Sequence, residues 1–386
     1  MLIKNLFPLL DRQTLHELDE FGRVLRKGVP LKGKHFEVLH KNVRALSDSL
    51  TSDREGLRKD YMTDSRFMGA YLHYFLPWNL YRLSRLFTGI EPYVNEGGTI
   101  IDLGSGPLTV PMALWIALPK MRERSLTFVC VDRASKVMAE GRKLFDVLTK
   151  GASKWKIVTV KGSLGMQLRE RADLVVAANT LNELNWTGRD SDQMHGKVAH
   201  SLTKYLKKDG RLLLVEPGLR QAARNLSQLR AELMDQGLMP LAPCPHAGYC
   251  PMHGQGQDSR WCHFNFGVEG APQWLADLTH KARLTKTGLS ISFLYMTTAE
   301  VNYVGSVRAV SEVFRLPQGR GQYACSSRGL TLLQYPQHGP VLFPGQYVDP
   351  EWPEESRTDL KSGAVILPVT AKLDIRKPDN AKPPKK

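Results

Sequence analysis

The stretch TIIDLGSG, residues 99–106, decides the fold. An apolar run rich in β-branched residues ends at Leu103, glycines follow at Gly104 and Gly106, and a helical pattern then continues to Lys120. Glycine lets a backbone turn tightly and approach a ligand closely. The stretch therefore predicts a strand, a ligand-binding loop and a helix in immediate succession.

The same alternation of strand and helix continues along the chain. Further strand-like runs are LTFVCVD (126–132), KIVTVKG (156–162), DLVVAANT (173–180) and RLLLVEPG (211–218). Continuous apolar strands that alternate with helices are typical of a parallel sheet covered on both faces. The expected fold class is α/β with a Rossmann-like sheet.

Four segments are expected along the chain. They are a helical N-terminal region (1–96), a Rossmann-like ligand-binding domain (97–240), a cysteine module with a β-rich lobe (241–335) and a C-terminal extension with a basic tail (336–386). The lobe is expected from the strand-like runs ISFLYMT (291–297), RAVSEVFRLP (308–317), GQYACSS (321–327) and GLTLLQYP (329–336). In the N-terminal region, the aromatic stretch 71–82 could stack on bases, but aromatic residues at helical spacing favour burial.

Charge and composition point to a polyanionic partner. The 386 residues contain 53 Lys and Arg against 38 Asp and Glu, a formal charge of +15. Such a surface attracts RNA or DNA through phosphate neutralisation; a merely soluble basic protein is the alternative. Four arginines near Cys325 could face RNA or protect strand edges. They are Arg308, Arg315, Arg320 and Arg328.

The N-terminus and the apolar runs bear on localisation. The first residues fit neither a secretory signal nor a transit peptide, and no run reaches the roughly 18 apolar residues of a membrane span. We therefore expect a cytoplasmic protein without a membrane partner. We expect a monomer, although the sequence does not fix the oligomeric state.

The glycine loop and the acid that ends the second strand predict a nucleotide-type site. A dinucleotide fingerprint requires glycine at Thr109, where it is missing. Asp102 with Asp132 resembles instead the S-adenosylmethionine site of Rossmann-like methyltransferases, although Leu108 replaces the usual third glycine, so a non-binding site is the alternative. The residues expected to bind the methyl donor are Asp102, Gly104, Ser105, Gly106, Asp132 and Asn179.

Catalytic candidates follow the fourth strand. Asn179, Asn182 and Glu183 could touch substrate or methyl donor, or could cap the following helix. The Asp/Asn-Pro-Pro-aromatic sequence of amino-group methyltransferases is not present. Cys244, which follows a proline after the fifth strand, is interpreted as a metal ligand and not as a nucleophile.

Four of the five cysteines have the spacing of a metal site. The expected ligands are Cys244, Cys250, Cys262 and Cys325. Four thiolates suit either a four-iron, four-sulfur cluster or structural zinc. Nearby His246, His253 and His263 keep a mixed zinc site open, and free thiols are the further alternative. Cys130 lies within an apolar strand and is expected in the core.

Several motifs together resemble one family. YLHYFLPWN (71–79), IIDLGSGPLT (100–109), NTLNEL (179–184), APCPHAGYCP (242–251) and WCHF (261–264), with VEPG (215–218) and Cys325, are similar to the methyltransferase-like family of small-ribosomal-subunit assembly proteins, which has bacterial members. The resemblance covers roughly residues 65–330. It implies a class I methyltransferase sheet that binds S-adenosylmethionine beside Gly104, Gly106 and Asp132, and an Fe–S insertion with a [4Fe–4S] cluster on the four cysteines.

The resemblance also implies partners and two competing functions. The partners are small-subunit rRNA and the assembling small ribosomal subunit, so the chain is expected to act in ribosome biogenesis and translation. It could transfer a methyl group to rRNA, or it could be a non-catalytic, cluster-dependent rRNA-binding assembly factor. A radical enzyme is disfavoured because the CxxxCxxC loop of that class is not present in the sequence.

Overall fold

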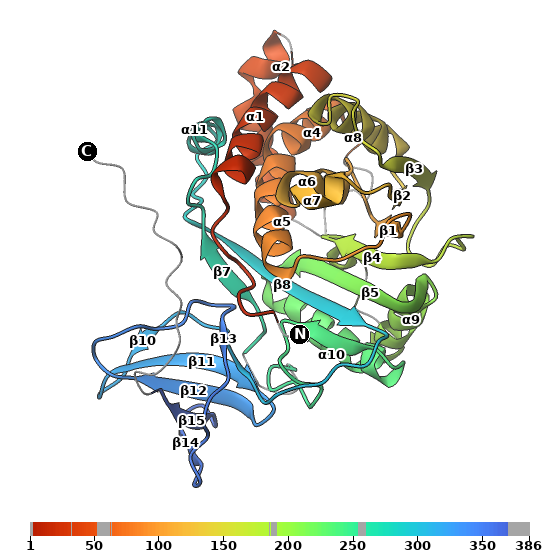
Figure 1. Cartoon of the computed structure of the whole chain (residues 1–386). Helices are drawn as coiled ribbons and strands as arrows, with labels where there is room; N and C mark the ends of the chain where they lie inside the picture. The colour runs from red at the N-terminus through yellow and green to blue at the C-terminus, as the bar shows by residue number, and fades with distance from the viewer. Residues whose placement is uncertain are drawn as a thin grey trace.

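The computed structural model describes residues 3–31, 33–51, 62, 64–184, 186, 191–253 and 260–369. Figure 1 shows a large sheet flanked by helices and a smaller sheet, drawn in blue, at its lower edge. The basic tail that the sequence predicts after about residue 372 lies outside the described residues.

The large sheet has a parallel half and an antiparallel half. Its strand order is β3-β2-β1-β4-β5-β8-β6, with β7 paired to β8. The parallel strands are β1 (Thr99–Leu103), β2 (Thr127–Asp132), β3 (Lys156–Lys161), β4 (Ala172–Ala178) and β5 (Leu206–Pro217). The strand order reverses between β1 and β4, and in open α/β sheets ligands bind beyond the carboxyl ends of the strands at such a point.

The antiparallel half corrects one prediction. Its strands are β6 (Met239–Ala242), β7 (Phe264–Gly267) and β8 (Gly288–Thr297). The run ISFLYMT was expected in the β-rich lobe, but as part of β8 it pairs antiparallel with β5 from Arg211↔Thr297 to Pro217↔Ile291. Seven consecutive residues of β8 are buried, as expected for a strand inside a sheet that is covered on both faces. The sheet is therefore mixed and continues past residue 240.

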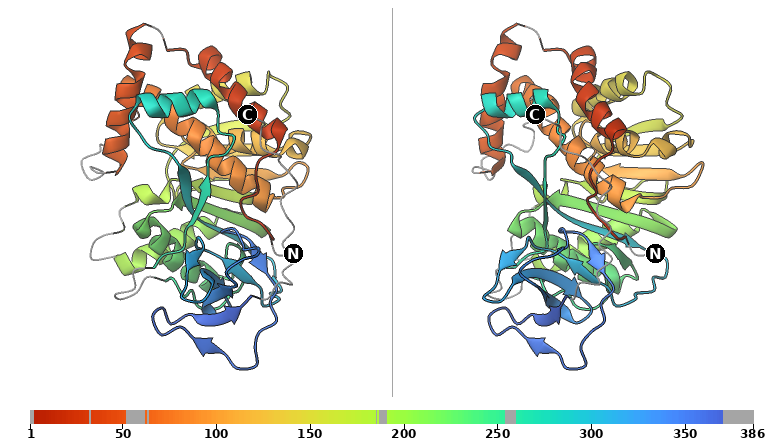
Figure 2. Two further views of the ribbon diagram at one scale, coloured as in Figure 1. Left: turned by 90° about the vertical axis from the view of Figure 1, so that its left-hand side faces the viewer. Right: turned by 60° about the vertical axis from the view of Figure 1, so that its left-hand side comes forward.

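Helices cover both faces of this sheet. Alternate residues of β1 enter separate cores: Ile100 packs with the N-terminal helices, whereas Ile101 and Leu103 face the other helix layer. One layer contains α1 (Arg12–Gly28), α2 (Lys34–Glu37), α3 (Leu39–Thr51), α4 (Ser65–Ala70), α5 (Leu76–Ile90), α6 (Thr109–Ala117), α7 (Pro119–Arg122), α8 (Ser135–Leu148) and α11 (Gln273–Lys281). The other contains α9 (Ser191–Thr203) and α10 (Arg220–Asp235). Figure 2 shows the sheet between the two layers.

The aromatic stretch of the N-terminal region is buried, as the sequence favoured. Tyr74, Trp78 and Tyr81 are each at most 3% exposed. The chain enters α5 through a π-helical turn, Tyr71–Phe75, a feature that often occurs near functional sites. Because its rings pack against α6 and the core, most of this stretch does not offer free faces for base stacking.

A second sheet follows the large one. Its strand order is β13-β9-β11-β12-β15-β14, and β10 pairs with β11. The strands are β9 (Val307–Ala309), β10 (Phe314–Arg315), β11 (Arg320–Ser326), β12 (Gly329–Tyr335), β13 (Tyr347–Val348), β14 (Arg357–Thr358) and β15 (Val365–Pro368). Residues after Tyr335 thus complete this sheet. The N-terminal segment reaches it through a bridge between Asn5 and Gln346.

No helix among the residues that the structure describes is long and apolar enough to cross a membrane.

Candidate functional site

A cavity of about 550 Å³ opens at the carboxyl ends of β1, β2 and β4. Gly104 and Gly106 line it, with φ angles of 68° and 52°. A Cβ at Gly104 would overlap Thr180 Oγ1, whereas one at Gly106 would meet no atom within 4 Å. Gly104 therefore allows two strand ends to approach, and Gly106 leaves backbone accessible to a ligand.

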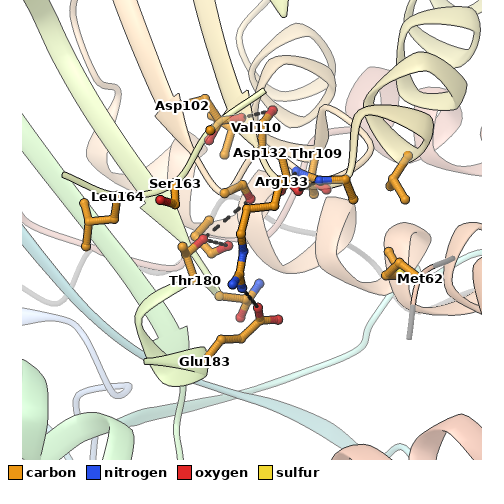
Figure 3. Close-up of a pocket in the computed structure, with 18 of the residues that line it drawn as sticks. Met62, Asp102, Thr109, Val110, Asp132, Arg133, Ser163, Leu164, Thr180 and Glu183 are labelled. Carbon is orange, nitrogen blue, oxygen red and sulfur yellow. Dashed lines mark hydrogen bonds and ion pairs between the residues drawn. The ribbon is translucent and has the colours of Figure 1, made fainter. Parts of the chain in front are cut away.

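Asp132 lines this cavity next to the glycine loop (Figure 3). Its Oδ2 accepts a hydrogen bond from the Gly106 amide at 2.9 Å, and its Oδ1 accepts one from the Ala134 amide at 2.8 Å. Each carboxylate oxygen has a further lone pair. The sequence-predicted acid therefore fixes the glycine loop and retains acceptor capacity towards the cavity.

Asp102 is the buried acid of the site. Its side chain is 0% exposed, its Oδ2 accepts a 2.6 Å hydrogen bond from Ser105 Oγ, and its Oδ1 has no hydrogen-bond partner among the described residues. Burial raises the pKa of Asp102 to about 7; the Ser105 hydrogen bond opposes the rise and the charge of Asp132 adds to it.

Leu108 does not block the cavity. The residue has φ 60°, the left-handed conformation that a glycine would adopt without strain. Its side chain is fully buried in the core and does not line the cavity. The backbone therefore follows the path of a three-glycine loop, although the third glycine is not there.

The three catalytic candidates that follow β4 do not all line the same cavity. Asn179, with φ 56°, lines the cavity, and its buried Oδ1 has no hydrogen-bond partner among the described residues. Glu183 lines the same cavity and lies 3.8 Å from Arg133 Nη2. Asn182 lines a separate small cavity beside Glu216.

Glu216 organises this strand end, a role that sequence analysis missed. From the end of β5, its buried carboxylate accepts hydrogen bonds from the amides of Thr180, Leu181 and Asn182 at 2.8–3.2 Å. The motif VEPG contained the residue, but a single acid after a strand does not reveal which turn it will cap.

The structure adds Tyr71, Arg133 and Thr180 to the cavity. Tyr71 comes from the π-helical turn, and burial followed by the charge of Glu183 raises its pKa. It therefore holds its proton at neutral pH and can donate a hydrogen bond, but it cannot act as a base. Its helical spacing predicted burial and gave no signal for a place in the site.

The four cysteines of the predicted metal site come from three parts of the fold. Cys244 and Cys250 lie in the loop after β6, Cys262 precedes β7, and Cys325 lies in β11 of the second sheet. Cys250, Cys262 and Cys325 pack in one cluster with Met252. All are free thiols, and the cluster links the cysteine loop to the second sheet.

The four cysteines of this group interact electrostatically. Burial, then the charges of Cys244, Cys250 and Cys262, raises the pKa of Cys325 well above its usual range. His246 Nε2 lies 3.2 Å from Cys325 Sγ. The cysteines are thus close neighbours, but no three His, Cys, Asp or Glu side chains within the described residues form a group suited to one metal ion.

Two buried arginines adjoin this group, and sequence analysis missed their role. Arg230, 3% exposed on α10, donates from Nη2 to the carbonyls of His246 and Gly248 at 2.9 and 3.0 Å. Arg308 is directly paired with Cys325 across β9 and β11.

Arg308 corrects one of the predicted RNA-facing arginines. The side chain is 0% exposed and donates from Nη1 to the Gly345 carbonyl at 2.7 Å. Burial lowers its pKa to about 10, while the neighbouring thiols, Cys244 first, oppose the shift. The residue cannot belong to an RNA-binding surface, because its side chain is fully buried where β9 of the second sheet pairs with Cys325.

Comparison with known proteins identifies the family. The family model described as mitochondrial small ribosomal subunit Rsm22 matches residues 70–288, more than half of the chain. The chain belongs to the Rsm22 family. The match covers α5, Cys244, Cys250, Cys262 and every residue that lines the cavity except Met62, and it ends at the first residue of β8. No curated protein matches the chain.

Solved structures give weaker similarities to this Rsm22-family chain. A putative class I S-adenosylmethionine-dependent methyltransferase from Listeria monocytogenes is 10% identical with a TM-score of 0.34, covering 75% of this chain and 88% of that one. A methyltransferase from Pyrococcus furiosus is 12% identical with a TM-score of 0.34, covering 56% and 83%. Similarities this low do not assign a function or a substrate.

Proposed function

We propose that this Rsm22-family chain is an S-adenosylmethionine-dependent methyltransferase-like protein that carries a [4Fe–4S] cluster and acts on small-subunit rRNA during ribosome assembly. The observation that carries the proposal is the cavity formed by the glycine loop and Asp132 at the point where the strand order reverses. The described family name, mitochondrial small ribosomal subunit Rsm22, supports the ribosomal partner.

The cavity residues fit an S-adenosylmethionine molecule. Asp132 has acceptor capacity for ribose hydroxyls, Gly106 leaves room for close approach, and Asn179 Oδ1 is a buried acceptor that lacks a partner within the described part of the chain. S-adenosylmethionine supplies an electrophilic methyl group when bound. The cavity is within the usual range of small-ligand sites, about 300–1,000 Å³.

The remaining cavity groups would orient a substrate. Asn179 and Glu183 stay candidates for contact with the substrate because they face the cavity, whereas we set Asn182 aside because it faces a different one. Tyr71 would donate a hydrogen bond from its retained proton. Arg133 lines the cavity 3.8 Å from Glu183, with both side chains partly exposed, and its positive charge would attract the phosphate of an RNA substrate.

The cysteine group fits a four-iron cluster by its donors and its surroundings. Four thiols from three parts of the fold lie close enough to interact electrostatically, and a cluster ligated by four thiolates carries net negative charge that must be compensated when buried. Arg230 and Arg308 lie beside the thiols, and Arg308 Nε and Nη2 have no hydrogen-bond partner among the described residues. One tetrahedral zinc ion is the alternative occupant, although the described residues do not form a group suited to a single metal ion.

Metal analysis tests the cluster. Protein purified without oxygen should contain about four iron atoms per chain, as the proposed cluster requires, and Cys325→Ser should lose iron as Cys244→Ser does. Cys130→Ser is the matched control, since Cys130 is fully buried on β2 away from the group. Stoichiometric zinc without iron would overturn the iron assignment and leave a structural zinc site.

A second function is favoured by the make-up of the cavity. Its described lining contains no histidine or cysteine, and each of its three acids is engaged: Asp102 with Ser105, Asp132 with the Gly106 and Ala134 amides, and Glu183 with Arg133. Histidine, cysteine and carboxylate side chains are common general bases in enzymes. This favours a non-catalytic assembly factor in which the cavity binds the methyl donor without transferring its methyl group.

Methyl transfer separates the two functions. Immature small subunits are incubated with the protein and S-adenosylmethionine labelled in the methyl group, and label in rRNA is measured. The proposal predicts labelled rRNA with the native chain and less label with Asp132→Ala, because that variant binds the methyl donor more weakly. Donor binding and subunit binding without labelled rRNA would establish the non-catalytic alternative.

A further inference from the structure

A second cavity, of about 780 Å³, lies between the cysteine module and the second sheet. Residues next to two of the grouped cysteines line this cavity. Trp261 and His263 flank Cys262 in sequence, and Tyr323 comes from β11 two residues before Cys325. None of the residues expected to bind the methyl donor lines it. It is therefore a separate site from the cavity at β1 and β4.

Aromatic rings form two walls of this cavity. The Trp261 and His263 rings stack with centroids 4.7 Å apart and an interplanar angle of 17°. Tyr323 is half-buried and packs against Phe314 at 5.1 Å. Rings held rigidly by such neighbours offer flat surfaces for a third ring at little entropic cost.

Positive charge lies at the mouth of the cavity. Arg260 and Lys361 are both exposed and line the cavity, and Arg260 Nη1 donates to the Ser362 carbonyl at 2.8 Å. Among the described lining residues Glu312 is the sole acid. A ligand with an aromatic ring and a negative charge therefore matches the wall and the mouth together.

We infer that this cavity binds an unstacked nucleotide of single-stranded RNA. A base would stack on Tyr323 or His263, Asn265 and Ser311 would offer hydrogen bonds to its edge, and the phosphate would meet Lys361. The chain's charge of +15 favours RNA over a neutral aromatic ligand. The inference rests on the proposed function, because it assigns an RNA contact within it.

The cavity shares a wall with the cysteines. Met252 and Val310 line it and also pack against Cys250 and Cys325. A change in the position of the cysteine loop therefore changes the shape of the cavity. RNA affinity at this site should depend on an intact cysteine group.

Fluorescence anisotropy with labelled single-stranded penta-uridylate tests the inference on the full chain. Tyr323→Ala should weaken binding about 5- to 150-fold, the equivalent of about 1–3 kcal/mol of base stacking. Tyr323→Phe keeps the ring and should bind like the native chain. Phe36→Ala removes a ring that is 67% exposed on α2, far along the chain from this cavity, and is the matched control.

Lys361→Ala provides a second variant on an exposed side chain, should Tyr323→Ala fail to fold. It should weaken binding and lower the salt dependence by roughly the contribution of one phosphate contact, a slope of about 0.7. Native binding by both Tyr323→Ala and Lys361→Ala would overturn the inference. Equal competition by free uridine monophosphate, molecule for molecule, would overturn the assignment to RNA.

The methyl-transfer assay distinguishes failure of this inference from failure of the proposed function. If the variants bind penta-uridylate normally while the native chain still labels rRNA, the second cavity is not the RNA contact and the proposed function stands. If the native chain binds neither penta-uridylate nor immature small subunits, the proposed function falls as well.

Discussion

Replacement of Asp102 by asparagine should change how the stability of the protein depends on pH. Burial raises the folded-state pKa of Asp102 to about 7 from its usual 3.8. Between these values the folded protein keeps a proton that the unfolded chain has lost. The free energy of unfolding therefore falls as pH rises through this window.

The size of the effect follows from the width of the window. It spans roughly three pH units, and each unit is worth about 1.36 kcal/mol, so the native chain loses about 4 kcal/mol between pH 4 and pH 7 through this group. Asp102→Asn has no such titration. Relative to the native chain, the variant should therefore gain stability steadily as pH rises.

Urea unfolding at pH 5, 6, 7 and 8 measures this difference. Ser105→Ala is a directional control, because it removes the 2.6 Å hydrogen bond that opposes the rise in the folded-state pKa and should extend the upper end of the window to higher pH. A constant difference between native chain and Asp102→Asn from pH 5 to pH 8 would refute the reasoning, since it would mean that the Asp102 carboxylate is not desolvated.

Two further predictions concern the glycine loop and the buried arginine. Gly104→Ala should lower the melting temperature more than Gly106→Ala, because both require a left-handed alanine, costing about 1–2 kcal/mol, but only at Gly104 does the new Cβ overlap Thr180; equal melting temperatures would contradict this account. Arg308→Met should reduce the iron content of anaerobically purified protein, because it removes a buried cation beside the thiols; unchanged iron by metal analysis would show that Arg308 only supports the second sheet.

The sequence predicts the parallel half of the fold well. TIIDLGSG corresponds to β1 (Thr99–Leu103) and its loop, and the other four runs correspond to β2, β3, β4 and β5. This succeeds because buried parallel strands are continuous apolar runs that glycine and helical patterns separate sharply. The residues expected to bind the methyl donor all line one cavity, because parallel strands end at the same edge of a sheet.

Long-range pairing explains the failures. The apolar run that forms β8 could pair within either sheet. Its sequence therefore does not show that it pairs with β5 in the large sheet. The burial of Arg308 depends on its pairing with Cys325, and arginine is ordinarily a surface residue. The short strands β13 and β14 have two residues each, too few to show a period. Sequence spacing also does not show that Asn179 and Asn182 line different cavities, because this depends on the hydrogen bonds from the amides of residues 180–182 to Glu216.

Calorimetric titration with S-adenosylmethionine tests most directly whether the cavity at β1 and β4 is a methyl-donor site. The account predicts saturable binding by the native chain and binding weakened by about 1–3 kcal/mol in Asp132→Ala, which removes a charged hydrogen-bond acceptor. No heat of binding at millimolar S-adenosylmethionine by the folded native chain would contradict it.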